Sequence, residues 1–165
     1  MAKPEALLRK FYDALDEDKF LAKKCPKCGN VEFPPKHACN ACGELYLDWI
    51  EVSEVTVSEI YKLGSAFTLT QLTPFAPLVG CEICVDGSVD TYSLIFGVND
   101  ENYTEMFNAL PFKAKLVRMP MGKFYSYAVS INGVLPVRKG EAKQTEENRM
   151  WNEMKLSDVG QDDKK

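Results

Sequence analysis

Apolar residues near the N-terminus recur at spacings of three and four, which is the pattern of one buried helix face. The stripe comprises Leu7, Leu8, Phe11 and Leu15. It predicts a helix over residues 4–22. The acidic run at 16–18 interrupts the pattern before a second apolar patch at 20–21, so we expect either one helix or two with a bend. Two alternatives stay open for the stripe: it packs on its own domain, or it docks on another subunit.

From Tyr46 to Val137 the pattern changes to short segments rich in β-branched and aromatic residues, which indicates strands. The expected strands are Leu47–Ser53, Thr56–Leu63, Phe67–Leu72, Leu78–Val85, Thr91–Val98, Lys113–Met119 and Lys123–Ile131. Asp86-Gly87 and Asn132-Gly133 tolerate the positive φ of tight hairpin turns. A short helix is expected at Tyr103–Leu110. Several short strands with one inserted helix are typical of a small closed barrel, for which the five-stranded OB-fold is the natural candidate.

The composition is that of an ordinary globular protein, with 165 residues of which 45% are hydrophobic and 27% charged. The net charge of −4 argues against broad attraction to nucleic acid or anionic lipid. The N-terminus lacks the apolar core of a secretory signal, and two prolines break the most apolar window, residues 66–85. We therefore expect no membrane segment and a cytoplasmic location, where cysteines stay reduced.

Four of the six cysteines form two C-x-x-C-G motifs, Cys25-Pro-Lys-Cys28-Gly29 and Cys39-Asn-Ala-Cys42-Gly43. A C-x-x-C turn lets two thiolates converge on one ion, and the glycine can adopt the positive φ that curls the backbone around the sulfurs. Two such knuckles predict a tetrahedral four-thiolate site, with one zinc ion expected and iron as the chemical alternative. Four protein ligands leave no open position for water, so we expect the metal to be structural.

The remaining cysteines, Cys81 and Cys84, share the C-x-x-C spacing but lie within an expected strand and lack the glycine. Residues i and i+3 of a strand face opposite sides with Cα atoms about 10 Å apart, so the pair can neither form a disulfide nor chelate a metal. Cys81 would share a buried face with Val79, Ile83 and Val85. We therefore expect a core role for Cys81, with thiol chemistry as the lesser alternative.

The chain is thus expected to be mainly β with a little helix, in four parts. These are a helical arm (1–24), a rubredoxin-like zinc ribbon (25–45), an OB-fold barrel (46–139) and a charged tail (140–165). The tail is polar but holds Met150, Trp151, Met154 and Leu156 at near-helical spacing. Partial disorder and docking on a partner are equal alternatives for this segment.

The paired CPxCG-type knuckles, with Phe33-Pro34-Pro35-Lys36 between them and Thr73-Pro74-Phe75-Ala76-Pro77 further on, resemble the zinc-ribbon plus OB-fold family long described as a domain of unknown function. The resemblance covers roughly residues 5–138 and implies a non-catalytic subunit that forms a hetero-oligomer with a thiolase-fold protein. The thiolase would carry the nucleophilic cysteine and the acid–base histidine. The small chain would supply assembly surface and part of the acyl-CoA site. The length and helical arm are also similar to the zinc-finger subunits of benzoylsuccinyl-CoA thiolases, which act in aromatic degradation.

Candidate ligand or partner residues lie beside the knuckles. Lys36 follows Phe33, Pro34 and Pro35, which would present one cation rigidly beside an aromatic ring. A CoA phosphate would bind this cation, with its adenine stacked nearby. In the alternative, the prolines only shape the ribbon loop and Lys36 is solvated.

Further candidates lie in the barrel half. Phe75 and Pro77 belong to a loop too apolar for open solvent, which favours burial against a partner, an acyl group or this chain's own core. Lys113 and Lys115 alternate along an expected strand, so they share a face where an anionic ligand would bind. Arg118 and Lys123 complete this basic cluster.

Independent catalysis is not favoured, because the single histidine, His37, is expected to be a loop or partner-facing residue beside an already complete thiolate set. A nucleic-acid-binding OB-fold is the rival hypothesis, since aromatic residues are available for base stacking. Residues 45–140, however, hold seven Lys and Arg against ten Asp and Glu, a net charge of −3. We therefore favour the acyl-CoA-associated subunit.

Overall fold

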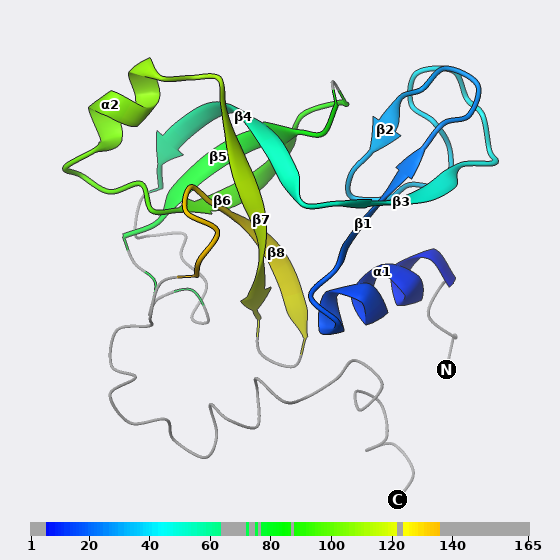
Figure 1. Cartoon of the computed structure of the whole chain (residues 1–165), viewed down its shortest axis with the longest axis horizontal. Helices are drawn as coiled ribbons and strands as arrows, with labels where there is room; N and C mark the ends of the chain where they lie inside the picture. Colours follow the sequence, from blue (N-terminus) through cyan, green and yellow to red (C-terminus); the bar gives the residue numbers. More distant parts are fainter. Residues whose placement is uncertain are drawn as a thin grey trace, which may run out of the picture.

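The computed structural model describes residues 6–63, 72, 75, 77–86, 88–121 and 124–135. These residues form a short N-terminal helix, a three-stranded sheet and a closed five-stranded barrel (Figure 1). The elements are α1 (Ala6–Asp16), β1 (Phe20–Lys24), β2 (Val31–Glu32), β3 (Asp48–Val52), β4 (Glu54–Lys62), β5 (Val79–Cys84), β6 (Thr91–Phe96), α2 (Tyr103–Asn108), β7 (Phe112–Pro120) and β8 (Tyr125–Ser130). The mainly β fold class with an N-terminal helix is confirmed.

The helix expected over residues 4–22 ends earlier, at Asp16, and the prediction of helix for 20–22 is wrong. Asp18 adopts a left-handed conformation with φ of 60°. The backbone N–H of Lys19 donates to the Ala14 carbonyl at 2.8 Å and that of Asp18 to the Leu15 carbonyl at 3.0 Å, which is a Schellman ending. The chain therefore leaves the helix axis, and Phe20–Lys24 form β1 instead.

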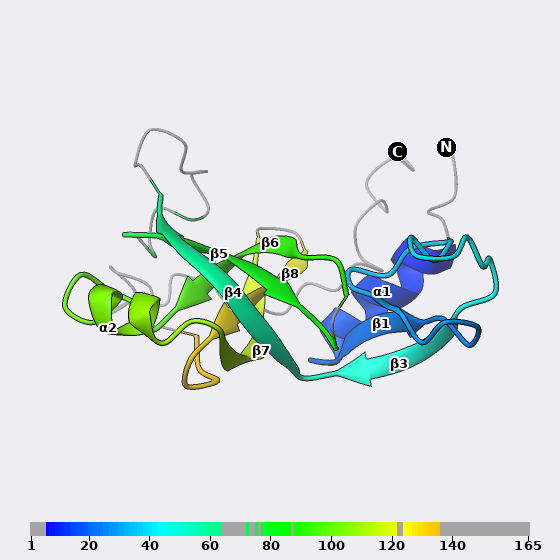
Figure 2. The ribbon, with the colours of Figure 1, turned by 90° about the horizontal axis from the view of Figure 1, so that it is seen from above.

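The small sheet has the order β2-β1-β3, with both pairs antiparallel. Strands β1 and β2 were not predicted. The strand expected at Leu47–Ser53 is present as β3, but it pairs with β1 rather than joining the barrel. The chain passes from β3 to β4 through a single residue, Ser53, so the small sheet and the barrel are directly connected (Figure 2).

The barrel closes in the order β4-β5-β6-β8-β7, because β7 pairs back onto β4. All its pairs are antiparallel except β6 with β8. With α2 inserted between the third and fourth barrel strands, this is the topology of an OB-fold, as predicted. Figures 1 and 2 show α2 at one end of the barrel and the three-stranded sheet at the other.

Helix α1 packs on its own chain through the buried face that holds Phe11 and Leu15. The Phe11 ring meets Phe33 of the ribbon and Tyr127 of β8, each with centroids 6.3 Å apart, while Phe33 and Tyr127 are 4.9 Å apart. Arg118 of β7 donates a hydrogen bond of 2.8 Å to the Asp16 carbonyl at the end of the helix. One hydrophobic core therefore runs from the helix through the small sheet into the barrel.

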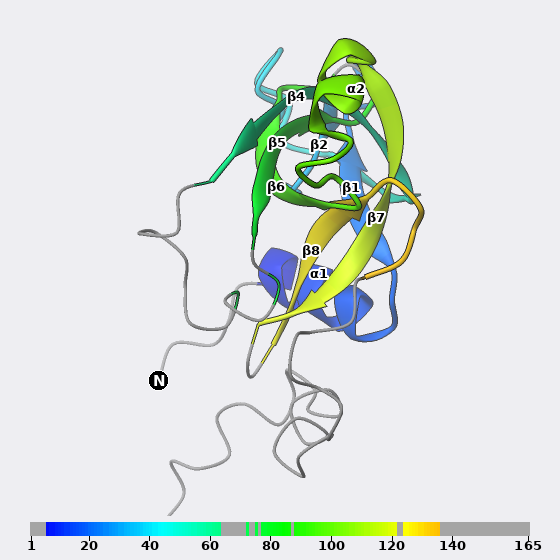
Figure 3. The same ribbon diagram turned by 90° about the vertical axis from the view of Figure 1, so that its left-hand side faces the viewer.

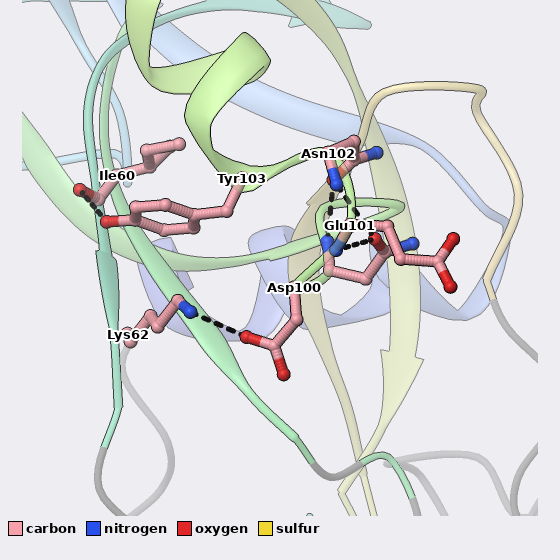
Figure 4. Close-up of polar contacts among 7 residues, drawn as sticks. Ile60, Lys62, Asp100, Glu101, Asn102 and Tyr103 are labelled. Carbon is pink, nitrogen blue, oxygen red and sulfur yellow. Dashed lines mark hydrogen bonds and ion pairs between the residues drawn. The ribbon is translucent and has the colours of Figure 1, made fainter.

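At the other end of the barrel, polar contacts hold the loop before α2 against β4 (Figure 4). The Tyr103 hydroxyl donates to the Ile60 carbonyl at 3.1 Å, and the Lys62 ammonium lies 2.6 Å from the Asp100 carboxylate. The Asn102 amide donates to the Gly97 carbonyl at 2.9 Å. These contacts hold α2, a helix of only six residues, at this end of the barrel.

Several expectations lie outside the described residues. They are the strand Phe67–Leu72 apart from Leu72, residues Gly87 and Lys123, and the tail 140–165. Among the helices that the structure describes, none has the length and apolarity needed to cross a membrane.

Candidate metal centre

The two cysteine knuckles have the same backbone geometry. In the first, the Gly29 N–H donates to the Cys25 carbonyl at 2.9 Å and the Cys25 N–H to the Asn30 carbonyl at 2.8 Å. In the second, the Gly43 N–H donates to the Cys39 carbonyl at 2.9 Å and the Cys39 N–H to the Glu44 carbonyl at 2.8 Å. Gly29 and Gly43 have φ values of 78° and 76°, the positive φ that the sequence predicted.

The two knuckles bring all four predicted metal ligands together. The sulfurs of Cys25, Cys28, Cys39 and Cys42 all lie within 4.8 Å of one another. Cross-knuckle sulfur distances are 3.6 Å from Cys25 to Cys42 and 3.5 Å from Cys28 to Cys39. Four sulfurs at about 2.3 Å from a tetrahedral zinc ion would be about 3.8 Å apart, whereas a disulfide needs about 2.05 Å. The cluster therefore fits one zinc ion, although iron takes the same donor set.

The protein shapes the acidity of these sulfurs. Burial opposes ionisation of Cys39, but hydrogen bonds from the backbone N–H groups of Cys42 and Ala41 outweigh it and lower the pKa of Cys39 to about 7. At Cys28 the Asn30 backbone N–H favours the thiolate, but the neighbouring sulfurs and burial outweigh it and raise its pKa to about 12. Cys39 thus ionises before Cys28, and a metal that binds the cluster must displace the proton of a thiol such as Cys28.

A buried carboxylate that sequence analysis missed connects the two knuckles. Glu32 of β2 is only 2% exposed, and its Oε1 accepts hydrogen bonds of 2.7 Å from Asn30 Nδ2 and from the Asn40 backbone N–H. Asn30 follows the first knuckle and Asn40 lies inside the second. Asn30 Nδ2 also lies 3.7 Å from Cys39 Sγ, so one amide contacts both the carboxylate and a sulfur. Glu32 is an outer-shell residue of the metal site.

The residues predicted between the knuckles divide by burial. Phe33 is 4% exposed and packs against Phe11 and Tyr127, so its ring offers no face to a ligand. Pro35 is buried as well. The side chain of Lys36 is 47% exposed, and its ammonium lies 3.5 Å from Glu32 Oε2. Lys36 therefore contacts Glu32 beside the cysteine cluster, and its side chain still faces solvent.

The predicted ligand or partner residues of the barrel half also differ in exposure and contacts. Phe75 is buried, with its ring 5.4 Å from Phe96, while Pro77 is exposed. Lys113 and Lys115 are exposed on one face of β7, as predicted. Arg118 does not join them, because its guanidinium lies 4.1 Å from the Tyr125 ring centre and donates to α1.

The second cysteine pair behaves as expected. Cys81 is fully buried in the barrel core with Val79, Ile83 and Val85, and Cys84 faces the other side of β5. Both are free thiols. Burial raises the pKa of Cys81 to about 12, so its thiol stays protonated at neutral pH. His37 is exposed in the loop between the knuckles.

Comparison with known proteins finds one family model and solved structures that are similar to parts of this chain. A solved structure described as "Ltp2-ChsH2(DUF35) aldolase" has 12% sequence identity and a TM-score of 0.54, covering 80% of this chain and 99% of that one. A second solved structure, a protein of unknown function from the DUF35 family of Sulfolobus solfataricus, has 16% identity and a TM-score of 0.48, and the match covers 76% of this chain and 85% of that one. None of the curated proteins compared with the chain matches it. Residues 13–45 match the family model of the ChsH2 rubredoxin-like zinc ribbon domain, which spans both cysteine knuckles.

Proposed function

We propose that this chain is the zinc-containing, non-catalytic subunit of a thiolase-type acyl-CoA complex, where it assists assembly and contributes to acyl-CoA binding. The observation that carries the proposal is a closed four-cysteine centre in a ribbon of the ChsH2 type, joined to an OB-fold barrel. The same fold covers nearly all of the chain from an aldolase described by two component names, Ltp2 and ChsH2. We therefore propose that the chain acts as one subunit of a hetero-oligomer.

The residues support binding rather than turnover. A zinc ion held by four thiolates would offset half of their negative charge and hold the two knuckles together, with no position left for substrate or water. The sequence has one histidine, His37, which is exposed in a loop. Cys81, a nucleophile in principle, is buried and protonated. The proposal therefore assigns the nucleophile and the acid–base group to a thiolase-fold partner.

CoA and acyl-group recognition form the finer part of the proposal. Lys36, Lys113 and Lys115 are the exposed cations that would meet the phosphates of a CoA thioester shared with the partner. We extend the proposal to benzoylsuccinyl-CoA as the acyl-CoA, on the resemblance of the ribbon and helical arm noted above. A cytoplasmic location belongs to the same proposal.

Binding of single-stranded nucleic acid is the weaker alternative. OB-folds bind nucleic acid mainly with their second and third strands, which here are β5 and β6. These strands contain Glu82 and no lysine or arginine. A basic groove that follows the phosphate backbone is therefore missing where the fold would need it.

The test is co-expression of the tagged chain with a candidate thiolase-fold protein. We expect co-purification at a fixed ratio, and turnover of benzoylsuccinyl-CoA and CoA only when both chains are present. A chain carrying Cys25→Ser and Cys39→Ser serves as the metal-free control. Full activity of the thiolase alone would contradict the proposal, as would a salt-sensitive mobility shift of this chain with single-stranded DNA or RNA.

A further inference from the structure

The outward face of β4, β5 and β6 carries an unexplained group of acidic and aromatic side chains. The strand registers align two cross-strand rows, Glu59 with Glu82 and Tyr92, and Tyr61 with Gly80 and Leu94. Residues directly opposite one another on adjacent strands project from the same side of the sheet. The three strands lie side by side in the barrel wall (Figure 3). Two carboxylates and two phenol rings therefore share one face, which we call the acidic tyrosine face.

The negative charge of this face is not neutralised within the described part of the chain. Neither Glu59 nor Glu82 forms an ion pair with any residue that the structure describes. Lys62, the lysine of β4, contacts Asp100 and lies 5.0 Å from the Tyr103 ring centre instead (Figure 4). Hydrogen bonding to Glu82, together with the charge of both carboxylates, raises the pKa of Tyr92. Among the described residues, the two carboxylates of this face therefore have no cationic partner.

Gly80 allows an aromatic ring to lie flat on the sheet. A Cβ atom at Gly80 would be 2.3 Å from Cε2 of Tyr61, so only glycine lets that ring rest on the β5 backbone. A pocket of about 370 Å³ adjoins the ring, and Tyr61, Tyr92 and Leu94 are among its lining residues. Tyr92 is 70% exposed, and the described residues that line the pocket include no lysine, arginine or histidine.

We infer that the acidic tyrosine face binds an arginine or lysine side chain presented by a partner protein. Cations are attracted to the faces of tyrosine rings, and two nearby carboxylates strengthen that attraction. A guanidinium group fits especially well, because it stacks on aromatic rings while donating hydrogen bonds to carboxylates. The same charges would repel the phosphates of CoA or nucleic acid. The inference rests on the proposed role as a partner-binding subunit, and it names the chemistry of one contact.

The test uses the full-length, zinc-loaded chain and a defined probe. The peptide acetyl-Gly-Gly-Arg-Gly-Gly-amide is titrated against protein labelled with ¹³C in its tyrosine rings. Its control is the same peptide with citrulline, which has the shape of arginine but no charge. We expect saturable shifts of the Tyr61 and Tyr92 resonances with a millimolar Kd, and binding about tenfold weaker for the citrulline peptide. The arginine peptide should also bind less well as sodium chloride rises from 50 to 500 mM.

Substitutions locate the site. The double variant Glu59→Gln and Glu82→Gln is expected to weaken arginine-peptide binding about tenfold, whereas Glu105→Gln on α2 should leave it unchanged. Zinc content and circular dichroism check that each variant is folded. Equal Kd values for the two peptides, equal binding by the double variant, or no tyrosine shift at 10 mM peptide would each overturn the inference. Because no thiolase is present, failure here is distinct from failure of co-purification, which would refute the proposed function alone.

Discussion

Glu32 gives the sharpest test of how the ribbon holds its metal. Its Oε1 receives one 2.7 Å hydrogen bond from each knuckle region, through Asn30 and the Asn40 backbone, in a 2% exposed position. A hydrogen bond to a charged acceptor contributes about 1.5–3 kcal/mol. Replacing Glu32 by alanine removes two of them and leaves the Asn40 N–H unpaired. We therefore expect Glu32→Ala to cost about 3 kcal/mol at the lower end of that range.

Because metal binding and folding are coupled in such a ribbon, this cost should appear as weaker zinc binding. A loss of about 3 kcal/mol corresponds to an apparent zinc Kd raised by about 100-fold. Glu32→Gln keeps an acceptor oxygen but loses the charge, so we expect a rise of about tenfold. The measurement is zinc competition with a chromophoric chelator, supported by the thiolate-to-cobalt absorption of the Co²⁺ form.

Lys36→Gln is the matched control for this experiment. It removes the partner at 3.5 Å from Glu32 Oε2 but keeps both knuckle hydrogen bonds. Since the Lys36 side chain is 47% exposed, the change should cost less than about 1 kcal/mol. A Glu32→Ala variant that binds zinc within twofold of wild type would refute the reasoning. So would a Lys36→Gln variant that loses as much affinity as Glu32→Ala.

Three further predictions concern the cysteines and the barrel. Cys25→Ser should lose the metal and unfold the ribbon, and elemental analysis that finds neither zinc nor iron in the wild-type chain would contradict this. Cys81→Ala should leave the activity of the reconstituted complex largely intact. In the folded wild-type chain, thiol reagents should not label Cys81 at pH 8, because burial raises the pKa of its thiol to about 12. Gly80→Ala should lower the free energy of unfolding, measured in urea, by about 1–3 kcal/mol, because the new Cβ would meet the Tyr61 ring. When Gly80→Ala is introduced into a Tyr61→Ala variant, most of that cost should disappear.

The metal ligands and the barrel strands were predictable because their signals are local. A C-x-x-C-G knuckle needs only five consecutive residues and one positive φ, and both knuckles form as expected. Strand β1 was missed because Phe20 and Leu21 follow the helix stripe so closely that they were included in the predicted helix as a second apolar patch. The left-handed conformation of Asp18, a residue that tolerates αL better than most, ends the helix there. Beyond it, residues 20–24 pair with β2 and β3, which are distant from them in the expected helix pattern.

The outer parts of the site depended on contacts that no local pattern contains. From the sequence alone, Glu32 cannot be told from a surface residue. In the structure it contacts Asn30, Asn40 and Lys36. Phe33 has the sequence context of a ligand-stacking ring, yet its neighbours come from α1 and from β8, more than ninety positions away. Buried polar groups and core aromatics of this kind are decided by tertiary packing rather than by propensity.

The continuous core also explains why a small metal ribbon would matter to the barrel. Phe33 follows Glu32 directly, so the residue that connects the knuckles and the residue that packs on Tyr127 are neighbours on one strand end. Loss of the metal would release Glu32 and, with it, the anchor that holds Phe33 against β8. The ribbon would then lose its fixed orientation relative to the barrel, while Arg118 and Tyr127 would still hold α1 on the barrel. The metal's contribution is then geometric: it fixes the position of Lys36 in the ribbon relative to the β7 lysines and the acidic tyrosine face, which both belong to the barrel.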